Sequence, residues 1–210
     1  DTVSHSCAMT DPRTIAAYDR CVEAYAEMIG DAPPHPTLVN FAARLAPGGY
    51  VLDLGCGPAH DAAYLRERGC QIDPVDASPE MVTLANTTFA IGARHASFDD
   101  IQTHSRYDAI WANFSLLHAP ADQFPGILQR LHRALKPGGI FHIAMKLGDG
   151  ARRDKFDRLY TYYSREALQR HLSDAGFTII EITLGEDLGL AGDVEPWIAL
   201  VCTPLSSSTA

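Results

Sequence analysis

Short apolar runs alternate with longer amphipathic runs from Tyr50 onward, and this alternation limits the folds that the chain can adopt. Strands that alternate with helices are typical of βαβ units, which build a largely parallel sheet with helices on both faces. The sequence therefore predicts a Rossmann-like α/β fold. The predicted strands are residues 50–54, 71–75, 93–96, 107–112, 139–145, 178–183 and 197–202, and the predicted helices between them are 60–68, 79–90, 121–135 and 164–175.

The two ends of the chain extend this pattern. No helical segment separates the last two predicted strands, so we expect an antiparallel hairpin there. Near the start, Asp11 followed by Pro12 is a typical helix start, and apolar side chains recur at helical spacing as far as Met28. A second helix is predicted at residues 36–45. We expect residues 11–205 to form one domain in which 11–46 are a helical cap, with loose tails at 1–10 and 206–210.

Composition excludes several classes of partner. The 210 residues carry a formal net charge of −9, which argues against nucleic acid because phosphate binding needs a basic face. No apolar run approaches the roughly 20 residues that span a bilayer, and the first residues lack a signal-peptide pattern. Five scattered cysteines form no CxxC or CxxH pair, so neither a metal site nor a disulfide framework is predicted. We expect a cytoplasmic monomer or homodimer.

The stretch VLDLGCGPAH at residues 51–60 ends the first predicted strand and opens a helix. Bare glycines allow a tight turn and a close approach to the backbone, and a helix N-terminus offers free N–H groups. In open parallel sheets, ligands bind beyond the carboxyl ends of the strands. The turn therefore predicts a binding site at this edge of the sheet.

A second acidic residue supports a nucleoside ligand. Asp76 ends the second predicted strand, roughly twenty residues after the glycine turn, where a carboxylate can accept hydrogen bonds from a ribose diol. The alternative, that Asp76 caps the next helix, is weaker because Ser78 is better placed for capping.

Two classes of cofactor fit these features, dinucleotides and S-adenosylmethionine. The run G-C-G-P-A-H lacks the third glycine of a dinucleotide site, and a proline enters the loop. Asp53, two residues before Gly55, suits a positively charged amine better than a pyrophosphate.

Four stretches in order, VLDLGCGPAHDAAYL, VDASPEMVTLA, YDAIWANFSLLHAP and LHRALKPGGIFHIAMK, resemble the motifs of class I S-adenosylmethionine-dependent methyltransferases. The resemblance implies a seven-stranded sheet whose last strand is antiparallel. It also implies cofactor contacts: Asp53 near the methionine amine, Gly55 and Gly57 along the backbone path, Asp76 at the ribose, Ala77 and Met81 near the adenine, Ser97 and Phe98 where the family usually has an acid for the adenine amine, and Asn113 by the methionine part.

The acceptor side is less defined by the sequence. His118, just past the fourth predicted strand, is the candidate general base, and a packing role weighs about equally with it. Tyr18 and Tyr25 lie on one helix face and are candidates for lining the pocket, although packing on the sheet is the simpler interpretation. Basic residues after the fifth strand, Lys146, Arg152 and Arg153 among them, are candidates for attracting an anionic acceptor, although charged loops are usually just solvated.

These features predict S-adenosylmethionine-dependent methyl transfer to a small-molecule acceptor by direct in-line displacement. Two alternatives stay open. One is a nucleotide-dependent oxidoreductase, which the glycine pattern disfavours. The other is a non-catalytic regulatory protein that binds S-adenosylmethionine without turnover.

Overall fold

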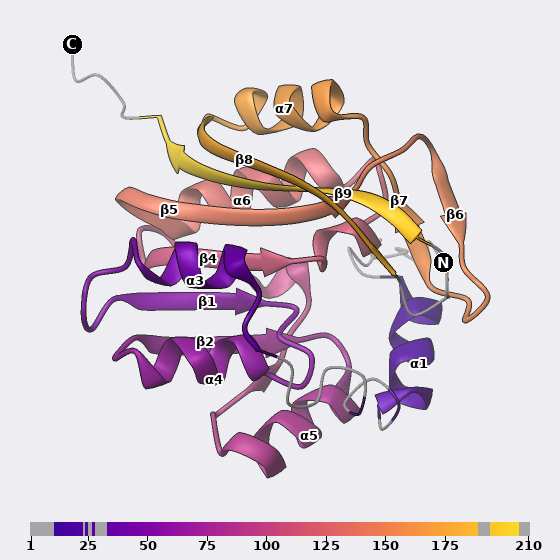
Figure 1. Ribbon diagram of the computed structural model, residues 1–210, viewed down its shortest axis with the longest axis horizontal. Coiled ribbons are helices and arrows are strands. Elements are labelled where there is room, and N and C mark those ends of the chain that lie inside the picture. The colour runs from indigo at the N-terminus through magenta and orange to yellow at the C-terminus, as the bar shows by residue number, and fades with distance from the viewer. Residues whose placement is uncertain (1–10, 23, 25–26, 28–32, 189–193, 206–210) are drawn as a thin grey trace, which may run out of the picture.

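The computed structural model describes residues 11–22, 24, 27, 33–188 and 194–205. Seven strands form one sheet in the order β3-β2-β1-β4-β5-β9-β8 (Figure 1). Along the chain the strands are β1 (Tyr50–Leu54), β2 (Gln71–Asp76), β3 (Arg94–His95), β4 (Tyr107–Asn113), β5 (Leu135–Lys146), β8 (Phe177–Leu188) and β9 (Val194–Pro204).

The pairing of the strands confirms the expected fold class. β1 runs parallel to β2 and β4, and the pairs β2–β3 and β4–β5 are also parallel. β9 is antiparallel to both β5 and β8, so the last strand is the reversed one. The strand order changes direction at β1, which places the tips of β1 and β4 at the topological switch point.

Helices cover both faces of this sheet. The apolar residues of α6 (Phe124–Ala134) and α7 (Arg165–Asp174) pack with Leu52 and Phe141 on one face. On the other face, α3 (Pro36–Ala42) and α4 (His60–Glu67) pack with Val51 and Trp111. Successive strand residues point to opposite faces, which is why Val51 and Leu52 belong to different clusters. α5 (Pro79–Phe89) follows β2, and Ser78 caps it as expected.

The helix predicted from Asp11 is present as α1 (Pro12–Arg20), and Asp11 caps it by accepting a hydrogen bond from the Thr14 N–H. Its expected continuation through Tyr25 and Met28 lies outside the described residues, as do the two predicted tails. Nowhere in the described ranges does a helix have both the length and the apolar character that crossing a bilayer requires.

One hairpin was not predicted from the apolar pattern. β6 (Ala151–Arg153) pairs antiparallel with β7 (Leu159–Thr161) and forms a separate two-stranded sheet. In Figure 1 this hairpin lies beside α1, beyond the carboxyl end of β5. Short 3₁₀ segments, η1 (Phe98–Asp100) and η2 (Leu116–His118), follow β3 and β4. The hairpin, α1 and η2 together surround the edge where the sequence predicts a site.

Candidate active site

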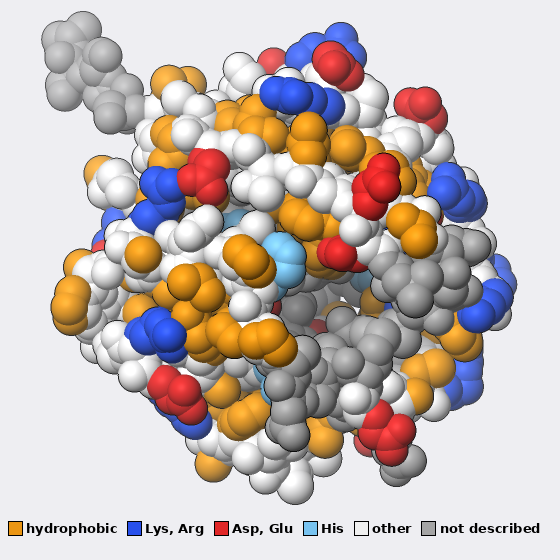
Figure 2. All heavy atoms as spheres, viewed as in Figure 1, with side chains coloured by type: hydrophobic (Ala, Val, Ile, Leu, Met, Phe, Trp, Pro, Cys, Tyr) orange, Lys and Arg blue, Asp and Glu red, His pale blue; other side chains and the backbone are white. Residues whose placement is uncertain are grey.

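A pocket with an empty volume of about 660 Å³, including space open to solvent, lies over the carboxyl ends of β1, β2 and β4. A hollow is visible near the middle of the face drawn in Figure 2. Two sides can be distinguished by the elements that line them. The turn side consists of Leu54, Gly55, Gly57, Asp76, Ala77, Ser78 and Met81, and the cap side of Thr14, Ile15, Tyr18, Phe114, Ser115 and His118; Ala96, Ser97, Phe98 and Asn113 complete the lining.

Gly55 and Gly57 form the predicted tight turn, with φ angles of 77° and 51°. A Cβ on Gly55 would lie 2.4 Å from the Cβ of Ser115. Gly55 therefore has to be glycine because its backbone lies so close to Ser115, in the segment after β4, that a side chain would not fit. Ala59 also has a left-handed φ of 67°, and its fully buried methyl group packs beside Ala62 and Ala85. That methyl group is not part of the pocket lining.

Asp76 lines the pocket from the end of β2. Its carboxylate accepts hydrogen bonds from the backbone N–H groups of Gly57 and Ser78, at 2.8 Å each. It therefore joins the glycine turn to the start of α5. Burial raises the pKa of this carboxyl group, and the two backbone hydrogen bonds partly offset that rise.

Asp53 lies beneath the turn, is almost completely buried and does not line the pocket. Its Oδ2 has no hydrogen-bond partner among the described residues. Burial raises the pKa of Asp53 well above its ordinary value, and the nearby charges of Asp61 and Asp76 raise it further. Burial and mutual repulsion thus disfavour the charged forms of Asp53, Asp61 and Asp76, and a cation bound beside them would stabilise those charged forms.

At the position predicted to contact the adenine, the hydroxyl group of Ser97 is already used in hydrogen bonds within its own segment. Ser97 and Phe98 both line the pocket. The Ser97 side chain caps η1, donating to Asp100 and accepting from the Asp99 N–H. Asp99, the acid next along the chain, accepts a hydrogen bond from Arg130. A contact between Ser97 and an adenine stays a prediction.

Three further predicted contacts, Ala77, Met81 and Asn113, line the same pocket. Asn113 lies at the end of β4, with its Oδ1 3.3 Å from the Nε2 of His142. The ring of His142 stacks on Trp111 at 3.7 Å, and the indole N–H of Trp111 donates to Asp61. The structure therefore brings every predicted cofactor residue except Asp53 to the pocket surface, and Asp53 lies directly below it.

His118 is buried on the cap side and hydrogen-bonded at both ring nitrogens. Its Nδ1 lies 2.6 Å from the carbonyl oxygen of Leu159, and its Nε2 lies 2.8 Å from the hydroxyl of Tyr18. A carbonyl can only accept, so Nδ1 carries the proton and Nε2 accepts from Tyr18. Burial lowers the pKa of His118 to about 4, and the charges of Arg158 and Lys146 add to the effect.

The structure separates the other predicted acceptor residues. Tyr18 lines the pocket, whereas Tyr25 lies outside the described residues. Lys146 and Arg152 both pair with Glu195 on β9, and Arg153 pairs with Asp11 at the start of α1. The predicted basic cluster is thus distributed over carboxylate partners, and none of its three members lines the pocket.

Comparison with known proteins gives the family. Residues 33–182 match the family described as "Methyltransferase domain". The chain belongs to this methyltransferase family. The class I S-adenosylmethionine-dependent family expected from the motifs is thereby confirmed, and S-adenosylmethionine is the cofactor of that family.

Similar sequences and a similar solved structure from other organisms agree with that assignment. A malonyl-[acyl-carrier protein] O-methyltransferase from Enterobacter lignolyticus is 30% identical over 135 residues, covering 59% of this chain and 52% of the relative. A 2-heptyl-1-hydroxyquinolin-4(1H)-one methyltransferase from Mycobacteroides abscessus is 34% identical over 115 residues, covering 51% of each chain. The chain spans about half the length of these curated relatives.

A solved structure shares the fold over nearly the whole chain. It is the Burkholderia thailandensis 1,6-didemethyltoxoflavin-N1-methyltransferase, with 1,6-didemethyltoxoflavin and S-adenosylhomocysteine bound. The TM-score is 0.75 at 24% identity, and the alignment covers 92% of this methyltransferase and 88% of that protein.

The residues of this chain fit the family's cofactor. Asp53 offers an unpartnered buried carboxylate oxygen, Asp76 lies at the strand tip expected for a ribose, and the glycine turn leaves its backbone bare. No group of three side chains that could hold a metal ion occurs in the part of the chain that the structure describes.

Sequence reasoning missed one residue of the cap side, Ser115, and named Arg158 only as one of the basic residues after the fifth predicted strand. Ser115 lines the pocket with a buried hydroxyl that has no partner among the described side chains and backbone. Arg158 is buried behind Tyr18. The signal for Arg158 was present, since it lies among tyrosines in DRLYTYY, but nothing in the sequence separates a buried arginine from an exposed one.

Proposed function

We propose that this methyltransferase transfers the methyl group of S-adenosylmethionine to a small-molecule acceptor by direct in-line displacement. The observation that carries the proposal is one pocket with two chemically different sides. The turn side has one carboxylate in its lining, Asp76, with the buried Asp53 and Asp61 close behind it, and the cap side has a tyrosine, a serine and a neutral histidine under α1.

S-adenosylmethionine supplies an electrophilic methyl carbon when it is bound, so the chain needs neither a covalent nucleophile nor a metal ion. Asp53 and Asp76 would hold the amine and the ribose. The Gly55–Gly57 turn and Asn113 would orient the methionine part, while Ala77, Met81 and Phe98 would enclose the adenine. Positioning of this kind lowers barriers by roughly 7–11 kcal/mol in the best-oriented intramolecular reactions.

The cap side would hold the acceptor and exclude water. Thr14, Ile15 and Tyr18 of α1 close the pocket opposite the strand tips. The names of the relatives support a small acceptor, because they include a hydroxyquinolone and a didemethyltoxoflavin. One relative is named for malonyl-[acyl-carrier protein], so a small acceptor group attached to a carrier protein is a variant of the same proposal.

Titration calorimetry tests the cofactor part of the proposal. We expect S-adenosylmethionine and S-adenosylhomocysteine to bind and NAD not to bind. Binding of NAD without S-adenosylmethionine would favour the oxidoreductase alternative. An acceptor panel followed by S-adenosylhomocysteine release then separates catalysis from regulation: cofactor binding with no turnover on any phenol, hydroxyquinolone, amine or carboxylic acid would favour the non-catalytic protein.

A further inference from the structure

We propose that the cap side selects an uncharged, mainly apolar acceptor and excludes anions and cations of the same shape. This acceptor class rests on the proposed function, because it concerns the substrate of that same pocket. It includes phenols and hydroxyquinolones in their neutral form and leaves out free carboxylates. The lining of the cap side, the hydrogen bonds of its polar groups and the pairing of the charges behind it all support the proposal.

The lining of the cap side contains no aspartate, glutamate, lysine or arginine among the described residues. Its larger side chains are the aliphatic Ile15 and the aromatic Tyr18 and Phe114. The carboxylate of Asp76, which also lines the pocket, belongs to the turn side. An ion that is buried without an opposite charge loses hydration that nothing replaces. An acceptor of either charge would therefore bind weakly on the cap side.

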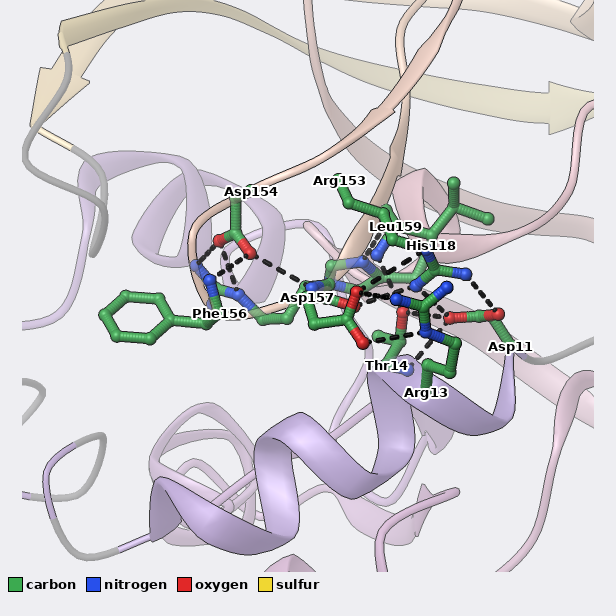
Figure 3. Close-up of polar contacts among 10 residues, drawn as sticks. Asp11, Arg13, Thr14, His118, Arg153, Asp154, Phe156, Asp157 and Leu159 are labelled. Carbon is green, nitrogen blue, oxygen red and sulfur yellow. Dashed lines mark hydrogen bonds and ion pairs between the residues drawn. The ribbon is translucent and has the colours of Figure 1, made fainter.

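Most polar side chains of the cap side already have hydrogen-bond partners within the chain. The Tyr18 hydroxyl lies 2.8 Å from Nε2 of His118, and Nδ1 of the same ring lies 2.6 Å from the Leu159 carbonyl oxygen. The Thr14 hydroxyl accepts from the Leu159 N–H at 2.8 Å (Figure 3). On this side, only the Ser115 hydroxyl has no partner among the described residues. The cap side therefore offers an acceptor few hydrogen bonds and no ion pair.

The two ionisable side chains of the cap-side lining both stay neutral. Burial raises the pKa of Tyr18 more than the nearby charge of Arg158 lowers it, so the surroundings of Tyr18 oppose a phenolate. Burial also lowers the pKa of His118 to about 4, so the same surroundings oppose an imidazolium. Burial penalises a charge of either sign. A charged acceptor atom beside these two rings would meet the same penalty.

The cations behind the cap side are paired with carboxylates of the chain itself. Arg158 donates to Asp154 through Nε and Nη2, at 2.9 and 2.6 Å. Lys146 forms an ion pair with Glu195. Both cations are mostly buried, and neither belongs to the pocket lining. A negative charge on the acceptor would therefore lie near ion pairs that are already complete, and it would gain little from them.

The experiment compares benzoate, benzamide and benzamidinium, which have nearly the same shape and are an anion, a neutral molecule and a cation at neutral pH. Their binding to the full chain is measured by ligand-observed NMR, with and without saturating S-adenosylhomocysteine, whose sulfur is uncharged. We expect benzamide to bind at least about tenfold more tightly than either ion, because nothing on the cap side replaces the ion's hydration. Equal or tighter binding of either ion, or no binding of benzamide at millimolar concentration, would overturn the proposal.

Charged variants of Ile15 test whether the preference arises on the cap side. Ile15 is only partly buried, so the chain can accommodate a longer side chain there. Ile15→Lys should shift the preference toward benzoate, and Ile15→Glu should shift it toward benzamidinium. Ile180→Lys is the matched control, because Ile180 is 48% exposed on the edge strand β8 and does not line the pocket. The control should keep the preference for benzamide.

The results separate the acceptor class from the proposed function. An unchanged preference for benzamide in both folded Ile15 variants, checked by circular dichroism, would place its binding outside the cap side and contradict the proposal. S-adenosylmethionine and S-adenosylhomocysteine are titrated on their own. If neither binds, the proposed function fails whatever the three probes show. If both bind and an ion binds as tightly as benzamide, only the acceptor class fails.

Discussion

At the scale of single residues, the glycine turn shows how one backbone position fixes the site. Gly55 combines a left-handed φ with a gap too small for a methyl group. Gly69 has the same kind of φ, 86°, but a Cβ added there would meet nothing within 4 Å. An alanine at Gly69 would therefore lose stability through the left-handed backbone alone, whereas an alanine at Gly55 would also lose stability through the overlap of its Cβ with Ser115.

We predict that Gly55→Ala destabilises the protein more than Gly69→Ala does. The control should lose about 1–2 kcal/mol through the left-handed conformation. Gly55→Ala should lose that amount and roughly 1–3 kcal/mol more, because the new Cβ overlaps Ser115. The free energy of unfolding in urea measures both. Equal losses would mean that Ser115 moves away without cost.

Asp76 is the residue on which cofactor placement depends. Asp76→Asn should weaken S-adenosylmethionine binding by about 1–3 kcal/mol, the usual scale for a hydrogen bond lost from a charged group. Asp73→Asn, on the same strand but paired with Arg94 and Tyr107, is the control. It should lower stability and leave cofactor affinity unchanged. Titration calorimetry with S-adenosylmethionine distinguishes the two variants. An unchanged affinity for Asp76→Asn would contradict the placement of the ribose at the end of β2.

At the scale of elements, the hairpin β6–β7 holds α1 over the pocket. Arg153 binds both carboxylate oxygens of Asp11 at 2.8 Å, and Arg13 binds Asp157 in the turn of the hairpin. The Leu159 N–H donates to Thr14 (Figure 3). The basic residues that the sequence suggested for the acceptor thus include one, Arg153, that contacts the cap helix instead.

We predict that Arg153→Ala loosens α1 and thereby raises the KM for the acceptor, whereas Arg152→Ala changes little. A partly exposed ion pair contributes up to about 1 kcal/mol, which corresponds to roughly fivefold faster amide exchange in α1. The adjacent Arg152 is more exposed and pairs at 3.5 Å with Glu195, so it is a close control. Hydrogen exchange of α1 measures the effect, and equal exchange in both variants would contradict it.

The secondary-structure elements also differ in how well the sequence predicted them. The sheet, its reversed last strand and the glycine turn were predictable because apolar spacing and turn chemistry are local signals. The hairpin was not, because ARR and LYT are too short to carry strand alternation, and Leu159 and Thr161 of β7 bond to Thr14 of α1 and to Ala119 just after η2, which are distant in the sequence. Glu195, which pairs with Lys146 and Arg152, and Asp11, which pairs with Arg153, lie 43 or more positions away along the chain, so no local pattern reveals these ion pairs.

At the scale of the whole molecule, two sets of buried ionisable groups respond oppositely to acid. His118 and His142 are buried as neutral rings, with pKa values lowered by burial to about 4 and about 3. Burial raises the pKa values of Asp53, Asp61 and Asp76. Falling pH therefore opposes the fold through the histidines and favours it through the carboxyl groups. The pH dependence of the free energy of unfolding contains both contributions. A comparison of wild type with a variant is therefore needed to isolate either one.

We predict that the stability advantage of wild type over His118→Gln shrinks as pH falls from 7.5 to 4. Below its ordinary value of 6.5 the unfolded histidine binds a proton, while the folded one stays neutral until pH reaches about 4. The unfolded state then binds more protons, so wild type should lose about 3 kcal/mol relative to the variant across this range. Urea denaturation at several pH values measures the difference, with His104→Gln at an exposed position as the control for the substitution. Parallel curves for wild type and His118→Gln would mean that His118 is hydrated or charged in the folded protein, and would contradict its assignment as a neutral ring that accepts a hydrogen bond from Tyr18.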